Sequence, residues 1–182
     1  MVRHLFICVG LVFLSTLVLG QSKYLCQESE VTFFSSAPLE DITAVNSAMN
    51  GVIDFEGKQF LVRIPIIRFD FPNDLMEEHF NENYMDTEDF PNAIYKGTFN
   101  ETIDPKKQGE SSIQCSGTLE IHGVEQQREI SVNLTIGKNS IQATSEFVVS
   151  LADHEIDIPK IVFQKIAEEI EVSIDATFEP LK

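Results

Sequence analysis

Hydrophobic and polar residues alternate with a period of two along much of this chain. The alternation is clearest in segments 112–121, 130–136 and 169–178, where apolar residues are separated by Ser, Thr, Asn, Gln, Asp or Glu. Successive side chains of a β-strand point to opposite faces, so this pattern predicts strands with one buried and one solvated face. Weaker forms of the pattern occur at 31–35, 49–55, 60–69, 92–101 and 140–151.

These segments amount to about eight strands joined mostly by short turns. Residues typical of turns occur at 56–58, 104–109, 122–123 and 137–139,. Short connections favour antiparallel neighbours, so a meander is the economical topology. Eight strands can close on themselves and leave an interior just wide enough for side chains or one small ligand. The sequence therefore predicts an all-β, eight-stranded antiparallel β-barrel.

Two segments interrupt the strand pattern and predict short helices. Segment 73–85 starts with a capping residue, Asn73 or Asp74, which is followed by the helix-favouring residues Leu, Met and Glu,. Segment 158–167 follows the same logic after Pro159, with one or two turns of helix expected. We expect both helices to lie at the mouth of the barrel.

The first twenty residues have the composition of a secretory signal peptide. Arg3 precedes an apolar run, and small residues precede Gln21,. The alternative is a membrane anchor, which Ser15 and Thr16 in the apolar stretch and the cleavable pattern disfavour. We therefore expect cleavage of residues 1–20 and a single domain at 21–182, located in the periplasm or secreted.

The chain is strongly acidic, and this limits its partners. Its 29 acidic and 13 basic residues give a net charge of −16, which becomes −17 when Arg3 is removed with residues 1–20. Nucleic acid is a poor partner for such a charge, and anionic membrane surfaces repel it. We therefore expect no nucleic acid and at most transient membrane contact. The sequence leaves open whether the protein is a monomer or a homodimer.

Two cysteines remain after residue 20, and their pairing is open at this stage. A disulfide between Cys26 and Cys115 requires Cα atoms within about 7 Å, which sequence cannot establish. Cys115 also lies on the apolar face of a predicted strand, where a free thiol acts as a small hydrophobic residue.

One group of residues resembles a metal or acid/base site. Glu78, His79 and Glu82 share one face of a helix, with Glu77 and Asp86 nearby,. Zinc sites, however, use two or more His or Cys ligands, and calcium loops use a defined alternation of acids around a Gly. A solvated helix face of an acidic protein explains the group equally well.

The remaining histidines add no recognisable catalytic motif. His154 lies in an acidic loop, and His122 lies at a turn without a recognisable nucleophile and partner acid,. Phosphate-binding loops and nucleotide fingerprints are also missing from the sequence. We therefore expect no enzyme and no cofactor. Two alternatives remain: a metal-binding protein or enzyme that uses His79, Glu82 and His154, and a filled barrel with a structural or interaction role.

Three stretches of the chain resemble motifs of the YceI-like family. EEHFNENYMDTEDFPNAIYKG is similar to the family's His-containing helical turn, acidic stretch and aromatic–Pro pair, which lead into an aromatic strand. GTLEIHGVEQQREISVNLTI is similar to its hairpin, and DHEIDIPKIVFQKIAEEIEVSIDA to its later Asp-to-Pro element and closing strand. The motifs occur in the family's order and spacing, and the resemblance spans about 31–178.

This resemblance implies a lipocalin-like, extended β-barrel in the periplasm of Gram-negative bacteria. It further implies that the barrel holds an isoprenoid-type lipid, such as a polyprenyl chain or a quinone, in a central tunnel and catalyses no reaction. Segment 31–55 departs from the family pattern, because it lacks the His that many members carry in their opening strand. This departure leaves open how the polar head of the ligand is held, and whether the ligand is the same isoprenoid, another lipid or none.

Inward-facing positions on the predicted strands supply the candidate binding residues. A bulge anywhere in a strand would exchange its two faces. Segments 75–85 and 156–166 are expected to act as lids over the entrance. The residues predicted to line the tunnel are Phe55, Phe60, Val62, Ile64, Phe99, Leu119, Phe147 and Ile174.

Overall fold

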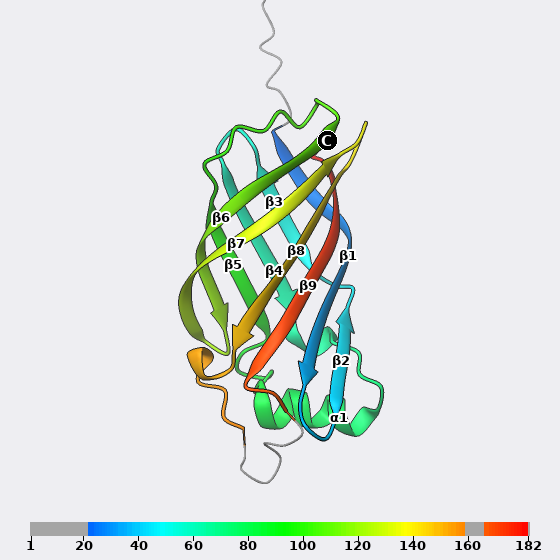
Figure 1. The fold of residues 1–182 in the computed structure, drawn as a ribbon, viewed down its shortest axis with the longest axis vertical. Coiled ribbons are helices and arrows are strands. Elements are labelled where there is room, and N and C mark those ends of the chain that lie inside the picture. The colour runs from blue at the N-terminus through cyan, green and yellow to red at the C-terminus, as the bar shows by residue number, and fades with distance from the viewer. Residues whose placement is uncertain (1–21, 159–165, 182) are drawn as a thin grey trace, which may run out of the picture.

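The structure is a computed structural model that describes residues 22–158 and 166–181. All its named strands belong to one antiparallel sheet (Figure 1). They are β1 (Lys23–Ser36), β2 (Asp41–Asn46), β3 (Asn50–Asp54), β4 (Gln59–Pro65), β5 (Asn92–Thr98), β6 (Gly109–Ile121), β7 (Val124–Ile136), β8 (Ile141–Ser150) and β9 (Glu169–Pro180).

The sheet closes into a barrel through β1. One edge of β1 pairs with β9, from Tyr24 opposite Pro180 to Phe34 opposite Glu171. The other edge is shared, because β3 pairs with its first residues and β2 with its last. Since β2 and β3 occupy one position in the ring, the nine strands form an eight-stranded barrel. The predicted all-β barrel and its meander from β3 to β9 are confirmed.

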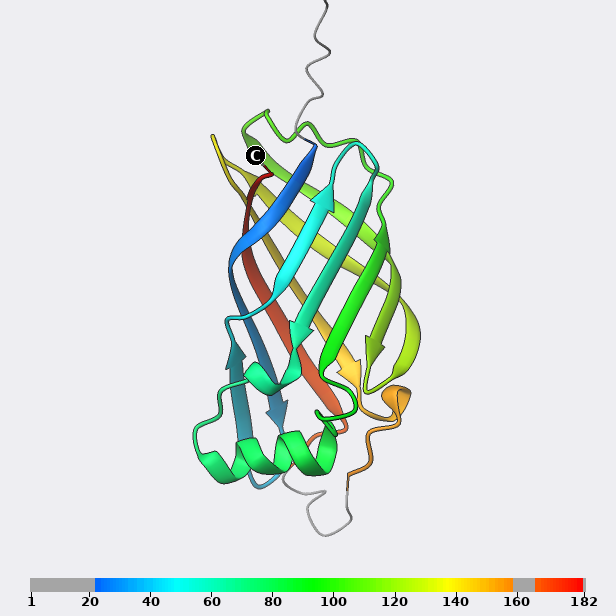
Figure 2. The same ribbon diagram turned by 180° about the vertical axis from the view of Figure 1, so that it is seen from behind.

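Short helical segments gather at one end of this barrel. η1 (Ile66–Arg68), α1 (Asp74–His79) and the π-helical turn η2 (Phe80–Tyr84) connect β4 to β5, and η3 (Ala152–His154) follows β8. Figure 2 shows α1 lying across this end of the barrel. Within the described residues, no helix has the length and apolar character needed to span a bilayer.

The N-terminus of α1 agrees with the predicted cap. The Asn73 side chain accepts a hydrogen bond from the Met76 backbone N–H at 3.0 Å,. The predicted helix at 73–85 is therefore confirmed as α1 followed by η2. Of the second predicted helix, at 158–167, residues 159–165 lie outside the described residues, as does the predicted signal peptide at 1–20.

The two ends of the barrel differ, and we call them the closed end and the open end. The closed end carries the β3–β4 turn, the loop 99–108 and the β7–β8 turn. The open end carries α1, η2, η3 and the β6–β7 turn (Figure 1). The first and last described residues meet at the closed end, where the Leu181 N–H donates to the Lys23 carbonyl at 2.8 Å.

Side chains fill the closed end. Tyr24 packs edge-on against Phe55, with ring centroids 5.4 Å apart, and Phe55 lies 6.1 Å from Phe99. The loop 99–108 covers these rings, since the Tyr24 hydroxyl donates to the Pro105 carbonyl at 3.4 Å. Other buried residues of this packed end include Ile113, Cys115, Leu134, Ile136, Ile141, Ala143, Ala176 and Phe178.

A bulge in β1 exchanges its inward and outward faces. The register with β9 shifts between Cys26 and Glu28, which leaves Gln27 as an extra residue,. Tyr24 is buried before the bulge, whereas Val31 and Ser35 are buried after it. Even-numbered residues therefore point inward near the closed end and odd-numbered residues point inward near the open end.

The barrel wall is incomplete between β7 and β8. Their backbone ladder runs only from Asn133 opposite Thr144 to Ile136 opposite Ile141. Toward the open end, side chains bridge the two strands instead. The Ser145 hydroxyl donates to the Ser131 carbonyl at 2.8 Å, and the Arg128 guanidinium donates to the Val148 carbonyl. We call this part of the wall the β7–β8 seam.

One strand prediction was wrong in its end point, and one strand was missed. The strand predicted at 60–69 ends at Pro65, because proline has no N–H for the ladder, and Ile66 then begins η1,. Strand β2 was not predicted at all. Its buried positions are Ala44 and Asn46, a small and a polar residue, so the alternation of apolar side chains is weak there.

Candidate ligand-binding cavity

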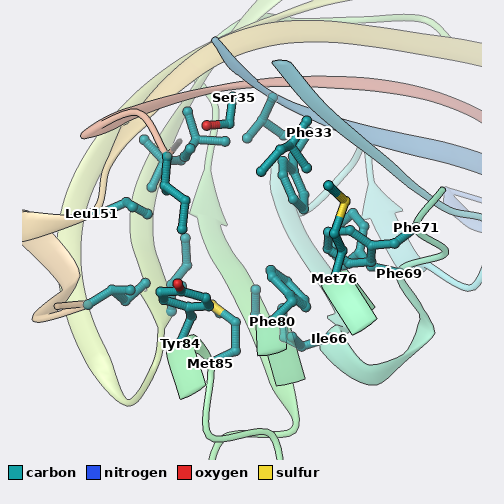
Figure 3. Close-up of a pocket in the computed structure, with 18 of the residues that line it drawn as sticks. Phe33, Ser35, Ile66, Phe69, Phe71, Met76, Phe80, Tyr84, Met85 and Leu151 are labelled. Carbon is teal, nitrogen blue, oxygen red and sulfur yellow. The ribbon is translucent and has the colours of Figure 1, made fainter. Parts of the chain in front are cut away.

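An apolar cavity occupies the open end of the barrel. Its volume is about 470 Å³. Figure 3 shows Phe33 and Ser35 facing Tyr84 and Met85 across it. The lining residues are Val31, Phe33, Ser35, Glu40, Ile42, Ile64, Ile66, Phe69, Phe71, Asn73, Leu75, Met76, His79, Phe80, Tyr84, Met85, Ala93, Leu119, Ile121, Phe147, Val149, Leu151, Ile156, Ile166, Ile170 and Val172.

Aromatic rings from three segments form one side of the cavity. Phe33 from β1 stacks on Phe80 from η2, with centroids 5.5 Å apart and planes 23° from parallel. Phe69 and Phe71, which follow η1, each lie 5.5 Å from Phe33. Phe71 also contacts Phe80 at 4.9 Å. Because Phe80, the residue directly after α1, belongs to this cluster, aromatic packing fixes the C-terminal end of the helix over the cavity,.

The polar groups of the cavity come from segments at its mouth. Four lining residues are polar or charged: Ser35, Glu40, Asn73 and His79. The others are aliphatic residues, aromatic residues and methionines. The Ser35 hydroxyl accepts a hydrogen bond from the Ala167 N–H at 2.9 Å. Burial raises the pKa of the Tyr84 phenol, which keeps this ring neutral in the cavity wall,. The arrangement suits a ligand that is largely apolar.

The proposed lids both border the cavity. Leu75, Met76 and Tyr84 contribute side chains from α1 and η2, and Ile156 and Ile166 contribute from the two sides of segment 159–165. Leu75 is also 59% exposed, so it lies at the rim between cavity and solvent. The position of α1 and η2 agrees with a covering role, whereas most of the second proposed lid, residues 159–165, lies outside the described residues.

Three of the predicted tunnel residues lie on the cavity lining: Ile64, Leu119 and Phe147. The other five are placed in the packed interior. Phe55 and Phe99 belong to the aromatic cluster of the closed end. Phe60 is buried against Tyr95, with centroids 4.7 Å apart, and Val62 and Ile174 pack on the same core. Their predicted contact with a ligand stays a prediction.

The structure also assigns lining residues that sequence parity did not single out. The main additions, from β1, the η1 region, α1 and η2, are Phe33, Phe69, Phe71, Met76 and Phe80. Phe33 lies between the buried residues Val31 and Ser35, so alternation within 31–35 was available as a signal. The other four lie outside strands, where period-two alternation carries no information.

His154 has a structural environment. It is only 1% exposed, and its Nδ1 lies 3.1 Å from the Val124 carbonyl at the start of β7. Burial lowers its pKa, because desolvation penalises the charged ring more than the hydrogen bond to Val124 favours it,. The neutral imidazole therefore ties η3 to the β6–β7 hairpin.

His122 connects three segments at the open end. Its Nδ1 lies 3.3 Å from the His154 carbonyl, and its Nε2 lies 3.4 Å from Asp86 Oδ2. Its ring also packs edge-on against Phe90 with centroids 4.6 Å apart. We call this contact group, made of His122, His154, Asp86 and Phe90, the histidine junction.

The side chains of the possible metal site, His79, Glu82 and His154, do not form a cluster. The residues that the structure describes contain no cluster of three or more His, Cys, Asp or Glu side chains that could hold an ion. His79 lies exposed on α1, where no other described residue forms a hydrogen bond or ion pair with its imidazole. His154 lies in the histidine junction instead.

The two cysteines of the barrel are free thiols. Cys115 is buried on β6, and burial raises its pKa to about 12,. Cys26 adjoins the bulge in β1, and desolvation raises its pKa as well. Since the thiolate is the reactive form, both side chains are expected to be unreactive at neutral pH.

A closed antiparallel barrel with an apolar cavity behind a short helix defines a lipocalin-type barrel. The family comparison assigns this barrel more narrowly. The YceI-like domain matches residues 25–178, so the chain belongs to the YceI-like family. The resemblance found in the three sequence motifs is thereby confirmed. No curated protein sequence matches the chain.

Solved structures with this fold are similar along most of their length. A polyisoprenoid-binding domain from Saccharophagus degradans has a TM-score of 0.75 at 15% identity, covering 88% of this chain and 99% of that one. BcnA from Burkholderia cenocepacia has a TM-score of 0.69 at 12% identity, covering 82% and 95%. A YceI protein from Campylobacter jejuni covers 100% of both chains, with a TM-score of 0.55 at 15% identity.

Proposed function

We propose that this protein is an exported, non-catalytic lipid carrier. It would sequester or transport an isoprenoid-type lipid, such as a polyprenyl chain or a quinone, across an aqueous space. The apolar cavity at the open end is the observation that carries the proposal. Membership of the YceI-like family and the polyisoprenoid-binding domain from Saccharophagus degradans support it.

The composition of the cavity wall suits such a ligand energetically. Apolar surface withdrawn from water contributes about 25 cal/mol per Å², so several isoprene units supply on the order of 10 kcal/mol before binding costs. Aliphatic and aromatic walls provide this without directional chemistry. Ser35, Asn73 and His79 at the mouth supply hydrogen-bonding groups for a polar head,.

Export is the part of the proposal that depends on residues 1–20. Their composition supports removal by a signal peptidase before Gln21, and the acidic chain would then be released as a mobile protein,. Periplasmic fractionation followed by N-terminal sequencing tests this. Recovery of the uncleaved chain in the membrane fraction would instead support an anchor.

Ligand extraction tests the binding function directly. The protein is purified without detergent and extracted with organic solvent, and the extract is analysed by mass spectrometry. We expect an isoprenoid-type lipid at a ratio approaching one per chain. If no lipid co-purifies and the protein binds neither quinone nor prenol probes, the proposal is contradicted and a purely structural barrel is favoured.

Two adjacent residues on β8 provide a matched pair of variants. Val149 faces the cavity and is 5% exposed, whereas Val148 is 42% exposed. Val149→Trp should fill the cavity and reduce lipid recovery and probe affinity at least about tenfold, a loss of 1.4 kcal/mol. Val148→Trp should leave both unchanged. Equal effects of the two substitutions would show that the cavity is not the binding site.

A further inference from the structure

The β7–β8 seam separates two strands that are each held on one side. Beyond Asn133 and Thr144 the described parts of β7 and β8 share no backbone ladder, and Figure 1 shows them diverging toward the open end. Strand β7 remains paired with β6 as far as Val124, and β8 remains paired with β9 as far as Ser150. The two strands can therefore move apart at the open end without losing a backbone hydrogen bond between them.

Three side-chain hydrogen bonds of the described residues span the seam, and we call them the straps. Two are the bonds from Ser145 and Arg128 described above. In the third, the Gln126 side-chain amide donates to the Asp153 carbonyl of η3 at 2.7 Å. A single bond of this kind contributes little by itself, because water offers its donor and acceptor other partners. The seam is therefore held less firmly than the paired parts of the wall.

A polar pocket on the outer wall reaches the seam from the solvent side. Outward polar residues of β1, β7, β8 and β9 form most of its lining. Its lining also includes Ser145 and Ile174, which belong to the inward-facing sets of β8 and β9. The next inward residues of these strands toward the open end, Phe147 and Val172, line the apolar cavity. The outer pocket and the cavity are therefore about 7 Å apart along the wall, the length of two strand residues.

The β6–β7 hairpin on one side of the seam also contacts the lid formed by α1 and η2. His122 in the hairpin turn lies 3.4 Å from Asp86, and its other ring nitrogen lies 3.3 Å from the His154 carbonyl of η3. Tyr84 and Met85, directly before Asp86, line the cavity. Movement of the hairpin away from β8 would therefore also disturb this edge of the lid.

We infer that the barrel opens along the β7–β8 seam, and that this opening, together with the lid, admits and releases the ligand. The straps hold the seam closed between these events. The β6–β7 hairpin would move away from β8 and widen the cavity beside Phe147 and Val149. The role of the opening in ligand passage rests on the proposed function, whereas the opening itself does not.

A covalent bridge across the seam tests the inference. Glu129 and Val148 are exposed residues of β7 and β8 beyond the end of the ladder. The substitutions Glu129→Cys and Val148→Cys are made in a background of Cys26→Ser and Cys115→Ala, and a short bismaleimide joins the two new thiols. Stopped-flow fluorescence then measures the uptake and release of a fluorescent farnesol analogue.

The matched control places the same bridge within the ladder of the same two strands. It joins Thr135→Cys to Gln142→Cys, at residues that already lie opposite each other. The seam bridge should slow uptake and release at least about tenfold and leave the equilibrium affinity within about threefold. The ladder bridge should leave both rates unchanged. Equal rates in the two bridged proteins would overturn the seam as the gate.

Removal of one strap should have the opposite effect. Arg128→Met keeps an extended side chain that cannot donate to the Val148 carbonyl, so both rates should rise at least about fivefold,. The control is Gln127→Met, because the Gln127 amide donates to Thr118 of β6 at 2.9 Å and does not cross the seam. Unchanged rates in Arg128→Met would contradict the role of the straps.

Spin labels measure the opening without any ligand. In Arg128→Met, labels on the Glu129→Cys and Val148→Cys pair should show a longer distance component that labels on the Thr135→Cys and Gln142→Cys pair do not. A single narrow distance across the seam would overturn the inference and leave the carrier function intact. A longer component together with failure of every lipid probe to bind would overturn the carrier function and leave the opening intact.

Discussion

His154 is a single buried residue that connects η3 to the β6–β7 hairpin at the open end of the barrel. Its ring is enclosed, its Nδ1 donates to the Val124 carbonyl, and its own carbonyl accepts from His122. Desolvation lowers its pKa below the ordinary value of 6.5. Folding therefore requires a neutral ring at a place where the unfolded chain would bind a proton in mild acid.

This linkage gives a pH prediction with a defined sign. Because the folded pKa of His154 is lowered, its contribution is fully present above pH 6.5 and is lost as pH falls through 6.5 toward the folded value,. One group changes the free energy of unfolding by at most about 1.4 kcal/mol per pH unit. Urea unfolding between pH 7.5 and 5 should show this slope.

The control for the pH prediction is His154→Gln, which keeps an amide donor but does not titrate. We expect a shallower decline of stability in this variant than in the unmodified chain over the same range. Parallel pH profiles for the two proteins would mean that His154 does not carry the effect.

At the residue scale, the alternation of apolar and polar residues predicted which side chains point into the barrel. It did not predict what those side chains contact there. The inward placement of Phe60 follows from the period of β4, and Phe55 and Phe99, the residues directly after β3 and β5, continue the period of those strands,. Whether an inward side chain meets a cavity or a packed neighbour depends on side chains from several strands, such as Tyr24 against Phe55. Sequence spacing contains no measure of that combined volume.

At the element scale, α1 determines access to the cavity. It is only six residues long, and its covering position depends on its N-terminal cap and on the stacking of Phe80 against Phe33. Isolated helices of this length are not stable in water. The cap and the aromatic cluster therefore supply the stability that the helix lacks by itself.

Removal of the cap should loosen the lid. In Asn73→Ala the Met76 N–H loses its side-chain acceptor, at a cost of about 1 kcal/mol,. Hydrogen exchange of the α1 amides should accelerate about fivefold, and bound lipid should leave faster. Asn73→Asp, which retains an acceptor and places a negative charge at the helix N-terminus, should restore both rates. Equal exchange rates in all three proteins would argue against the cap as the support of the lid.

The strands that the sequence predicted alternate strictly between apolar and polar residues, and the strand that was missed does not. Strands β6, β7 and β9 are long and alternate strictly, so their existence was predictable,. Helix α1 was predictable from its capping residue. Strand β2 was not, because its role depends on pairing with the last residues of β1 while β3 pairs with the first.

At the scale of the whole molecule, an acidic protein exposes apolar residues around its open end. Leu39 in the β1–β2 turn is 66% exposed, and Ile67 and Leu75 are each 59% exposed. With a net charge of −16, attraction to anionic headgroups is absent,. Contact with a lipid surface would therefore depend on these few apolar side chains and would be brief.

Ligand transfer from vesicles should reveal this contact. Leu39→Glu and Leu75→Glu together should slow uptake of a prenyl probe from phosphatidylcholine vesicles about tenfold, because apolar contact with the bilayer is lost. Equilibrium affinity measured without vesicles should change less. Leu61→Glu together with Val148→Glu, on the outer walls of β4 and β8 and 43% and 42% exposed, adds the same charge and is the matched control. An equal effect of the control would attribute the change to charge alone.

The meeting of the first and last described residues at the closed end bears on how this barrel can be used. Residues 23 and 181 are hydrogen-bonded neighbours, and the cavity lining includes α1 and η2 at the opposite end of the barrel. A short peptide bridge could join them, with new ends opened in the β7–β8 turn, to give a circular permutant. A surface tether attached through residue 181 would likewise leave the mouth facing solution. The barrel is thus a suitable scaffold for an immobilised sensor of small apolar molecules.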